Sequence, residues 1–353
     1  MNASEQRHIN EQVRAASARG TPLVIRGGGS KDFLGRRTQG EVLDVSTFRG
    51  VVHYEPSELV ITARAGTPLA EIESTLAERN QMLGFEPSHF GTAATLGGTI
   101  ACGLSGPARP FRGAARDFVL GAKIVNAKAE VLNFGGEVMK NVAGYDVSRL
   151  MCGAYGTLGV LLEISLKVLP RPASEITLAL EFNDETADTR MSEWQRDPLP
   201  LSGLCYDGDR LHVRLSGAEQ AVSAARRRIG GEVDARGDAF WESLREQRGA
   251  FFDGSGDLWR LSVPPATRAL AISGKQLIDW GGALRWFKTT QAAADIFAAA
   301  GSVGGHATRF RGAAEAQDIF QPLPAALLAL HRRLKQAFDP HGIFNRGRLY
   351  PDF

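Results

Sequence analysis

Three consecutive glycines after an apolar run constrain this chain more than any other feature. Residues 22–35 read PLVIRGGGSKDFLG, so a short strand expected over 22–26 leads directly into Gly27, Gly28 and Gly29. Contiguous glycines let successive backbone N–H groups turn the same way and form a small nest for an anion. The loop indicates either a phosphate-binding turn or an ordinary glycine-rich turn, and by itself it does not decide between them.

The spacing of these glycines excludes two common nucleotide-binding loops. A dinucleotide fingerprint requires G-x-G-x-x-G between a strand and a helix. A loop for nucleoside triphosphates requires G-x-x-x-x-G-K-[ST], which brings a lysine and a hydroxyl to the terminal phosphates. Neither spacing occurs here, because the three glycines are contiguous and the loop continues through Ser30 and Lys31.

A longer glycine-rich tract occupies residues 84–117 and reads GFEPSHFGTAATLGGTIACGLSGPARPFRGAARD. Its glycines are expected to break any regular element. Its low charge and its flanking strands favour a segment that wraps closely around something rather than a disordered one.

Periodicity and turn residues predict the elements of the first half. Ser4 is expected to cap a helix that Gly20 closes, and Thr67-Pro68 to start a second helix with proline at its first position. Alternating apolar residues predict strands, and residues 163–168 are expected to form a strand with one face buried. The expected strands cover 41–45, 51–54 and 58–64, with a hairpin over 118–134.

The sequence pattern changes after Pro170 and Pro172, where the second half of the chain begins. Strands and helices alternate there, which predicts an antiparallel sheet with helices on one face. The expected elements are a strand over 211–215, a hairpin turning at Gly281-Gly282, and helices over 218–229, 291–300 and 325–338. We therefore expect an α+β protein with domains at 1–170 and 171–323, and a C-terminal helix and tail over 324–353 that return to the first domain.

Composition excludes several classes of protein. The net charge is +2, and the short basic run Arg226 to Arg228 fits the solvated face of a helix, so we expect no nucleic-acid binding. The three cysteines contain no CxxC pair, which predicts no iron–sulfur or zinc site built by this chain alone and fits a reducing compartment. The polar N-terminus predicts no signal peptide, and the chain has no apolar run long enough to span a membrane.

Four motifs together resemble a known family. They are IRGGGS at 25–30, ATLGGTIACG at 94–103, KNVAGYDVSRLMCGAYGTLG at 140–159, and FDPHGIFNRGR at 338–348. They are similar to the FAD-binding domain of the vanillyl-alcohol oxidase type, also called the p-cresol methylhydroxylase type. In length and motifs the chain resembles the FAD-binding (E) subunits of bacterial glycolate oxidases. The resemblance is strong over 20–170, moderate over 336–349 and loose between.

The resemblance implies an FAD site, and NAD is the weaker inference. The first glycine loop would hold the pyrophosphate through backbone N–H groups, since a diphosphate needs several donors and little side-chain bulk. A side chain at Gly28 would accordingly be expected to project towards the phosphates. The second tract would run under the ribityl chain and the isoalloxazine, and the GTLGV segment would lie near the adenine and ribose. The implied cofactor residues are Arg26, Gly27, Gly28, Gly29, Ser30, Pro87, Thr95, Leu96, Gly97, Gly98, Ala101, Ser105, Gly159, Val160 and Asn345.

Departures from the family pattern narrow the chemistry. Members with covalent flavin carry a histidine directly after the glycine loop, where this chain has Ser30, so FAD is expected to be non-covalent. Members that oxidise D-2-hydroxy acids carry an HxGDGNxH segment for metal and substrate, and nothing here matches it. Two segments come nearest to this pattern. One contains His212, which is expected to lie in a strand, and the other contains His306, which stays a candidate for lining a cavity. The usual NPGK tail appears as NRGR, which keeps the glycine turn and a terminal cation, Arg348.

The catalytic residues are unknown from the sequence, and the candidates are weak. Residues 140–146 form a polar island that fits either a helix N-terminus or a site in which Asn141 or Tyr145 lies near the flavin ring or a substrate carboxylate. Arg348 fits either a surface arginine or a cation near the flavin N1–C2=O edge, where it would favour reduction. His306 completes these candidates. Cys102 and Cys152 are interpreted as buried packing residues, and no metal site is expected.

Three functional hypotheses stay open, and the first is favoured. In the first, the chain is the FAD subunit of a complex that oxidises glycolate or D-lactate, and it works with a catalytic flavoprotein paralogue and an iron–sulfur subunit. In the second, it is a self-sufficient FAD-dependent alcohol or D-2-hydroxy acid dehydrogenase, which the missing histidine segment argues against. In the third, it is a scaffold that has lost its ligand, which the intact glycine tracts argue against. The first hypothesis implies a cytoplasmic location, or one at the inner membrane reached through the complex.

Overall fold

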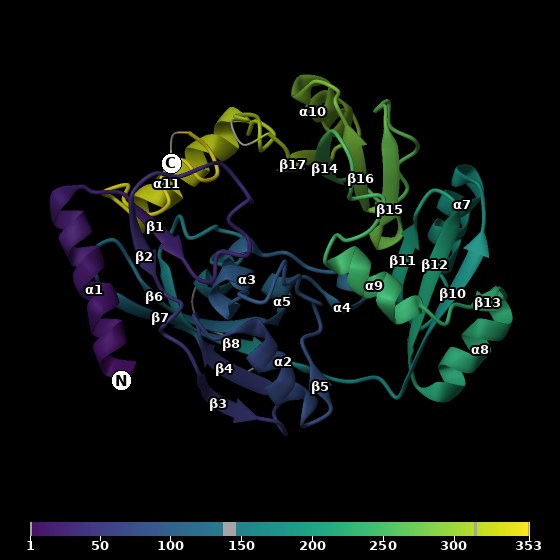
Figure 1. Cartoon of the computed structure of the whole chain (residues 1–353), viewed down its shortest axis with the longest axis horizontal. Helices are drawn as coiled ribbons and strands as arrows, with labels where there is room; N and C mark the ends of the chain where they lie inside the picture. The colour runs from purple at the N-terminus through teal and green to yellow at the C-terminus, as the bar shows by residue number, and fades with distance from the viewer. Residues whose placement is uncertain (1, 137–145, 314–315, 352) are drawn as a thin grey trace. The chain divides into compact units, whose positions relative to one another are not determined.

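The computed structural model describes residues 2–136, 146–313, 316–351 and 353, which form two compact units (Figure 1). Unit 1 comprises Met1–Leu104, Ala114–Pro170 and Pro322–Phe353, whereas unit 2 comprises Ser105–Gly113 and Arg171–Gln321. The division of the chain into an FAD-binding domain and a cap domain stays a prediction.

A five-stranded antiparallel sheet forms the centre of unit 1, in the order β3-β4-β8-β6-β7. The predicted hairpin over 118–134 is confirmed as the antiparallel pair β6 and β7. The strands are β3 (Val51–Glu55), β4 (Val60–Arg64), β6 (Val119–Val125), β7 (Val131–Gly135) and β8 (Val160–Lys167).

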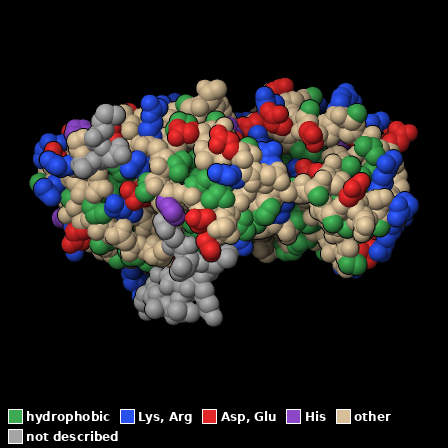
Figure 2. All heavy atoms as spheres, turned by 90° about the horizontal axis from the view of Figure 1, so that it is seen from below, with side chains coloured by type: hydrophobic (Ala, Val, Ile, Leu, Met, Phe, Trp, Pro, Cys, Tyr) green, Lys and Arg blue, Asp and Glu red, His purple; other side chains and the backbone are tan. Residues whose placement is uncertain are grey.

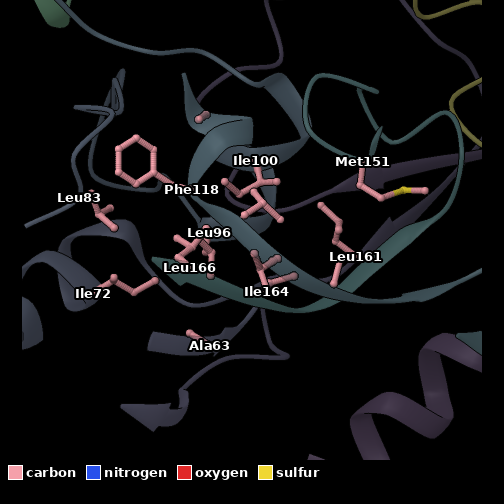
Figure 3. Close-up of a cluster of buried hydrophobic side chains, with 14 of the residues drawn as sticks. Ala63, Ile72, Leu83, Leu96, Ile100, Phe118, Met151, Leu161, Ile164 and Leu166 are labelled. Atoms are coloured by element: carbon pink, nitrogen blue, oxygen red, sulfur yellow. The ribbon is translucent and has the colours of Figure 1, made fainter. Parts of the chain in front are cut away.

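Apolar clusters cover both faces of this sheet. Because successive residues of a strand point to opposite sides, neighbouring residues of β8 belong to different clusters. Leu161 of β8 packs in one apolar cluster with Leu69 of α2 and Ile100 of α3, part of which Figure 3 shows. Leu162 packs in a second cluster with Val13 of α1 and Phe344 of the C-terminal tail. The sheet is therefore an inner layer, although the strand over 163–168 was expected to have one face buried. Ser165 of β8, for example, is buried and shares a 2.8 Å hydrogen bond with Thr62.

The remaining elements of unit 1 surround the sheet. The short parallel pair β1 and β2 carries the first glycine loop. Helix α1 begins at Asn2, two residues before the expected cap at Ser4, and α2 begins at Leu69, with Pro68 as its capping residue. These elements are α1 (Asn2–Arg19), β1 (Leu23–Arg26), β2 (Glu41–Asp44), α2 (Leu69–Ala77), β5 (Gln81–Met82), α5 (Ala115–Phe118), α6 (Val147–Leu150), β9 (Leu169–Pro170) and α11 (Ala325–Phe338).

The second glycine tract contains regular structure, so the expectation that its glycines break every element was wrong. Helix α3 (Leu96–Cys102) forms because the Thr95 hydroxyl accepts the N–H of Gly98 at 3.3 Å and caps its first turn. Gly103 ends the helix in the left-handed region, at φ +63°. Glycine therefore terminates this helix but does not prevent it.

An eight-stranded antiparallel sheet, in the order β13-β10-β12-β11-β15-β16-β14-β17, forms unit 2. The predicted turn at Gly281-Gly282 is confirmed, since it joins β15 to β16 through a short 3₁₀ helix. The elements are α4 (Arg109–Arg112), β10 (Ser174–Glu181), α7 (Asp184–Trp194), β11 (Leu201–Tyr206), β12 (Arg210–Gly217), α8 (Glu219–Ile229), β13 (Glu232–Val233), α9 (Gly237–Arg245), β14 (Asp257–Ser262), β15 (Lys275–Asp279), η1 (Trp280–Gly282), β16 (Leu284–Thr289), α10 (Ala293–Ser302) and β17 (His306–Arg311).

Helices cover both faces of this second sheet rather than the single face expected from the sequence. Leu178 of β10 packs with Met191 of α7 and Val222 of α8. Its neighbour Thr177 points the other way and accepts a 2.9 Å hydrogen bond from the indole N–H of Trp241 in α9. An α+β fold with antiparallel sheets is confirmed, but the layering of helices was not visible in the periodicity.

The molecular surface mixes charges on the face that Figure 2 shows, where acidic and basic side chains are interspersed with apolar ones. Within the described part of the chain, no helix combines the length and apolar character needed to cross a bilayer.

Candidate functional site

A cavity of about 350 Å³ lies within unit 1, where four segments far apart in the sequence meet. These segments are the loop after β1, the start of α3, the loop before β8 and the C-terminal tail. The lining residues are Val24, Ile25, Arg26, Gly27, Gly28, Gly29, Ser30, Lys31, Asp32, Arg37, Thr38, Val45, Ala65, Thr95, Gly97, Gly98, Ala101, Cys102, Tyr155, Gly156, Gly159, Leu161, Asn345 and Arg348.

The first glycine loop approaches the second tract so closely that no side chain fits between them. A Cβ on Gly28 would lie 1.5 Å from the carbonyl oxygen of Ala93, and one on Gly27 would lie 2.4 Å from the Thr95 hydroxyl. The expectation that a side chain at Gly28 projects towards a bound phosphate was therefore wrong. It would project into the neighbouring backbone, so glycine at this position permits the two loops to pack and form one wall of the cavity.

The backbone donors of this loop fit an anionic ligand. Within the described ranges, the N–H groups of Gly27, Gly28, Gly29 and Ser30 donate to no acceptor in the protein. Adjacent N–H groups without internal partners need water or a ligand, and an anion satisfies several of them at once. This is the donor set that a diphosphate requires.

The charged side chains that line the cavity are mainly cationic: Arg26, Lys31, Arg37 and Arg348 against Asp32. Arg26 pairs with Asp32 at 2.8 Å, and the Arg348 guanidinium donates to the backbone carbonyl of Asp32 at 3.1 Å. Lys31 is buried and donates to the carbonyl of His89 at 3.2 Å. The one carboxylate that the described lining contains is therefore held by arginine, and the excess positive charge suits a phosphorylated ligand.

Most of the implied residues of the second tract reach the cavity. Thr95, Gly97, Gly98 and Ala101 line it, but Leu96 points into the apolar core and is 1% exposed. The difference follows from the helix, because Leu96 opens α3 on the face that packs against the sheet.

The loop before β8 and the tail close the other side of the cavity. Tyr155, Gly156 and Gly159 line it, whereas Val160 is fully buried in the core beside α1. Asn345 bridges this side, because its side-chain carbonyl accepts the N–H of Ile25 at 2.8 Å and its side-chain amide donates to the carbonyl of Tyr155 at 2.6 Å. One side chain of the tail thus fixes β1 and the loop before β8 in place.

A buried ion pair positions the tail itself. Lys335, in the last turn of α11, donates to the Asp339 carboxylate at 2.7 Å and to the carbonyls of Thr157 and Phe344 at 2.8 Å each. Asp339 also accepts the backbone N–H groups of Ile343 and Phe344. This explains the FDPHGIFN motif: its aspartate folds the turn that brings Asn345 to the cavity.

Some residues implied by the resemblance are not among the described residues that line the cavity. Pro87 is buried without lining it, Ser105 belongs to unit 2, and His306 is exposed at the start of β17. Asn141 and Tyr145, together with Lys140, fall outside the described residues. His212 lies buried in β12, where it stacks on Phe240 and bonds Asp207, as the interpretation of a strand histidine predicts.

The cavity holds few groups capable of acid–base chemistry. None of the described lining residues is a histidine or a glutamate. Burial raises the pKa of the Cys102 thiol to about 11, although the nearby Lys31 and Arg348 charges lower it, so this thiol stays protonated at neutral pH. The arrangement can bind and orient an anionic cofactor, but its described lining residues include no evident base for a hydroxyl proton.

Several lining residues were missed from the sequence. Lys31, Asp32, Arg37 and Thr38 continue the first glycine loop, and Tyr155 with Gly156 lies inside a motif already quoted for the resemblance. The signal that could have found them is their position beside the glycines, because a loop that turns around a ligand presents several consecutive residues to it.

Comparison with known proteins supports the interpretation of this chain as an FAD-binding protein. Residues 2–135 match the family described as FAD binding domain, and residues 288–349 match the C-terminal domain of FAD linked oxidases. The glycolate oxidase subunit GlcE of Escherichia coli (strain K12) is 53% identical over 97% of this chain and 96% of its own length. The glycolate oxidase subunit GlcD of Bacillus subtilis (strain 168) is 29% identical over 52% of this chain and 40% of its own length.

The fold is shared with a solved structure of low sequence identity. p-Cresol methylhydroxylase with substrate bound superposes with a TM-score of 0.70, at 15% identity, over 98% of this chain and 87% of that one. The predicted vanillyl-alcohol oxidase type of fold is thereby confirmed. On the strength of its identity to GlcE over nearly its whole length, the chain belongs to the family of the glycolate oxidase subunit GlcE, among the FAD-linked oxidoreductases.

Proposed function

We propose that this chain is the FAD-binding subunit of a glycolate oxidase complex, in which glycolate is oxidised to glyoxylate. It would act with a catalytic flavoprotein paralogue and an iron–sulfur subunit, and D-lactate is a second substrate of the same class. Unit 1, roughly residues 1–170 with the tail 324–353, would be the FAD-binding domain, and residues 171–323 the cap domain. The complex would reside in the cytoplasm or at the inner membrane.

One observation carries the proposal: the cavity of unit 1 combines an excess of cationic side chains with four backbone N–H groups that have no partner among the described residues of the protein. Gly27 to Ser30, Arg26 and Lys31 would hold the diphosphate of FAD. Asn345 would hold the loops around the diphosphate in place through its hydrogen bonds to Ile25 and Tyr155. The identity to GlcE over nearly the whole chain supports assigning the cavity to FAD rather than to another phosphorylated ligand.

The side chains at the cavity support a non-covalent cofactor. Ser30 occupies the place where relatives with covalent flavin carry a histidine, and none of the described lining residues supplies one. The Cys102 thiol, with its pKa raised to about 11 by burial, is a poor nucleophile at neutral pH.

The lining favours a role in electron transfer over substrate oxidation by this chain alone. Bound FAD would supply the two-electron chemistry, but removing hydride from a 2-hydroxy acid also needs a base for its hydroxyl proton. Asp32, the one carboxylate among the described lining residues, is paired with Arg26 at 2.8 Å. A self-sufficient FAD-dependent alcohol or D-2-hydroxy acid dehydrogenase is the second candidate function, and it would need a base from outside the described lining.

Two measurements on the purified chain test the proposal. Acid precipitation should release yellow FAD into the supernatant, and flavin retained in the pellet would contradict non-covalent binding. Dye reduction with glycolate or D-lactate should be slow with the chain alone and fast after its partner subunits are added. Turnover by the lone chain at the rate of the assembled complex would overturn the electron-transfer role and support the self-sufficient enzyme, while a colourless chain that binds no added FAD would overturn both.

A further inference from the structure

The first turns of α11 expose an apolar surface. Residues 321–330 read QPLPAALLAL and contain no charge. Leu327 and Leu330 are 40% and 51% exposed, and because they are three positions apart they lie on one side of the helix. The other exposed large hydrophobic side chains of the described residues are Phe33, Val42, Val52 and Val233, which lie on four separate segments. Leu327 and Leu330 are the centre of a wider exposed surface that extends over more than half of the circumference of these turns, and we call it the α11 face; it consists of Ala325, Ala326, Leu327, Ala329 and Leu330.

The helix is attached to unit 1 mainly through its other end. Lys335 is its one fully buried residue, and Leu334 and Phe338 pack against the apolar cluster beneath the sheet. An isolated helix of this length is only marginally stable in water, and most helices gain their stability by packing an apolar face. The first turns of α11 therefore present apolar surface that a second surface would stabilise by covering it.

The charges around the face indicate what kind of surface covers it. No acidic residue occurs from Gln321 to Phe338, whereas the exposed Arg332 and Arg333 follow the face directly. In a parallel pair of two copies, these arginines would meet their own counterparts. In an antiparallel pair they would meet the positive N-terminal end of the other helix, which has no acidic residue in its first turn. A second copy of this chain is therefore a poor occupant.

The residue types also argue against a lipid surface. Helices that lie in a membrane interface insert Trp, Phe and several leucines. The α11 face instead consists of three alanines and two leucines. Small side chains allow another protein element to approach the helix closely, because the distance between packed helices depends on the side chains at their contact. Arg333 then supplies a cationic edge for carboxylates on the partner.

We propose that the α11 face is the docking surface for another subunit of the oxidase complex, one that presents an apolar groove edged by Asp or Glu side chains. This proposal rests on the proposed function, because the partner is taken from that complex. The partner would cover Leu327 and Leu330, and its carboxylates would pair with Arg333.

The test compares surface variants in binding to the purified partner subunits. Replacing both leucines (L327D/L330D) should weaken binding about tenfold or more, because buried apolar residues at the centre of an interface carry most of its affinity. R333E should weaken binding, whereas R333K should bind like the wild type because it keeps the positive charge. V52D is the matched control and should bind like the wild type, since Val52 is 45% exposed on β3, which Figure 1 shows apart from α11. FAD content and thermal melting of each variant establish that the fold is kept.

The outcomes separate this proposal from the proposed function. If the wild-type chain binds FAD but assembles with none of the subunits, the complex itself is wrong. If it assembles and L327D/L330D assembles equally well, only the docking surface is wrong. Two further results would contradict docking of another subunit on the α11 face. If the wild type is a dimer and L327D/L330D is a monomer, the face binds a second copy of this chain. If the wild type binds vesicles of anionic phospholipid and L327D/L330D does not, the face binds a membrane.

Discussion

The side-chain carbonyl of Asn345 accepts the backbone N–H of Ile25 at 2.8 Å, across 320 positions of sequence. Ile25 is the penultimate residue of β1, directly before the glycine loop, and Asn345 lies in the C-terminal tail. The same amide donates to the carbonyl of Tyr155 at 2.6 Å. One side chain therefore ties together the glycine loop, the loop before β8 and the tail, which are three of the segments that form the cavity.

Replacing Asn345 separates its structural role from its role beside the ligand. N345L loses both hydrogen bonds and places a branched side chain at φ +39°, so unfolding should become easier by about 2–3 kcal/mol. N345D keeps the acceptor for Ile25 and tolerates this backbone angle, but its carboxylate faces the Tyr155 carbonyl and a bound diphosphate. We expect N345D to lose less stability in urea unfolding than N345L, yet to bind FAD at least about tenfold more weakly by fluorescence titration. Unchanged affinity in N345D would place the diphosphate elsewhere.

Gly28 offers a test of loop packing. G28A adds a Cβ that would lie 1.5 Å from the carbonyl oxygen of Ala93, so the two loops must separate. We expect a loss of at least about 3 kcal/mol in stability, together with loss of FAD, as measured by urea unfolding and by flavin absorbance after gel filtration. The matched control is G301A near the end of α10, where the new Cβ would sit 3.5 Å from the Gln321 amide. This control should change stability by less than about 1 kcal/mol. Full stability and full FAD content in G28A would contradict the close packing of the two loops.

Local signals in the sequence were enough for much of the fold. Helix α11 spans Ala325–Phe338 as expected, because its apolar positions and the following Asp-Pro mark both ends. The hairpins β6–β7 and β15–β16 were predictable from alternation and turn residues. The glycine loop was recognised because contiguous glycines after a strand have few other uses.

The rest depended on contacts between distant segments. Helix α3 was missed because the glycines outweighed the capping signal of Thr95, whose hydroxyl bonds the N–H of Gly98. Leu96 and Val160 sit inside otherwise correct motifs but face the core, and only the packing of α3 and β8 decides that. In the sequence, Lys335 looks like an ordinary polar residue of a helix. Nothing in the residues around it indicates that its ammonium group donates a hydrogen bond to the carbonyl of Thr157.

The reactivity of Cys102, which lines the cavity, can be compared with that of Cys152, which is not among the described lining residues. Burial raises the pKa of Cys102 to about 11 and that of Cys152 to about 12, so at pH 8 each thiol should react with iodoacetamide roughly 100-fold or more slowly than an unperturbed one. The rate should rise with pH above the ordinary value and should become normal in urea. Added FAD should slow Cys102 further, because Cys102 lines the cavity, and should leave Cys152 unaffected. Peptide mass spectrometry of the apoprotein distinguishes the two sites, and rapid labelling of native Cys102 at pH 8 would contradict the raised pKa of its thiol.

The Lys335–Asp339 pair should dominate the stability of the tail. K335M removes the cation but leaves the Asp339 carboxylate buried, which should cost about 3–5 kcal/mol, and K335M/D339N should recover part of this loss. Burial lowers the pKa of Lys335 below its ordinary 10.5, although Asp339 raises it. Between the two values the unfolded chain holds a proton that the folded chain has lost, so stability rises with pH there.

The difference in unfolding free energy between the wild type and K335M should therefore grow as the pH approaches 10.5 from below. Urea unfolding at several alkaline pH values measures it, with the variant cancelling the titration of all other groups. A difference that shrinks with pH would mean that the ion pair raises the pKa of Lys335 more than burial lowers it. FAD affinity supplies the second readout: because Lys335 holds the carbonyls of Thr157 and Phe344 beside the cavity, K335M should bind FAD more weakly even where it is fully folded.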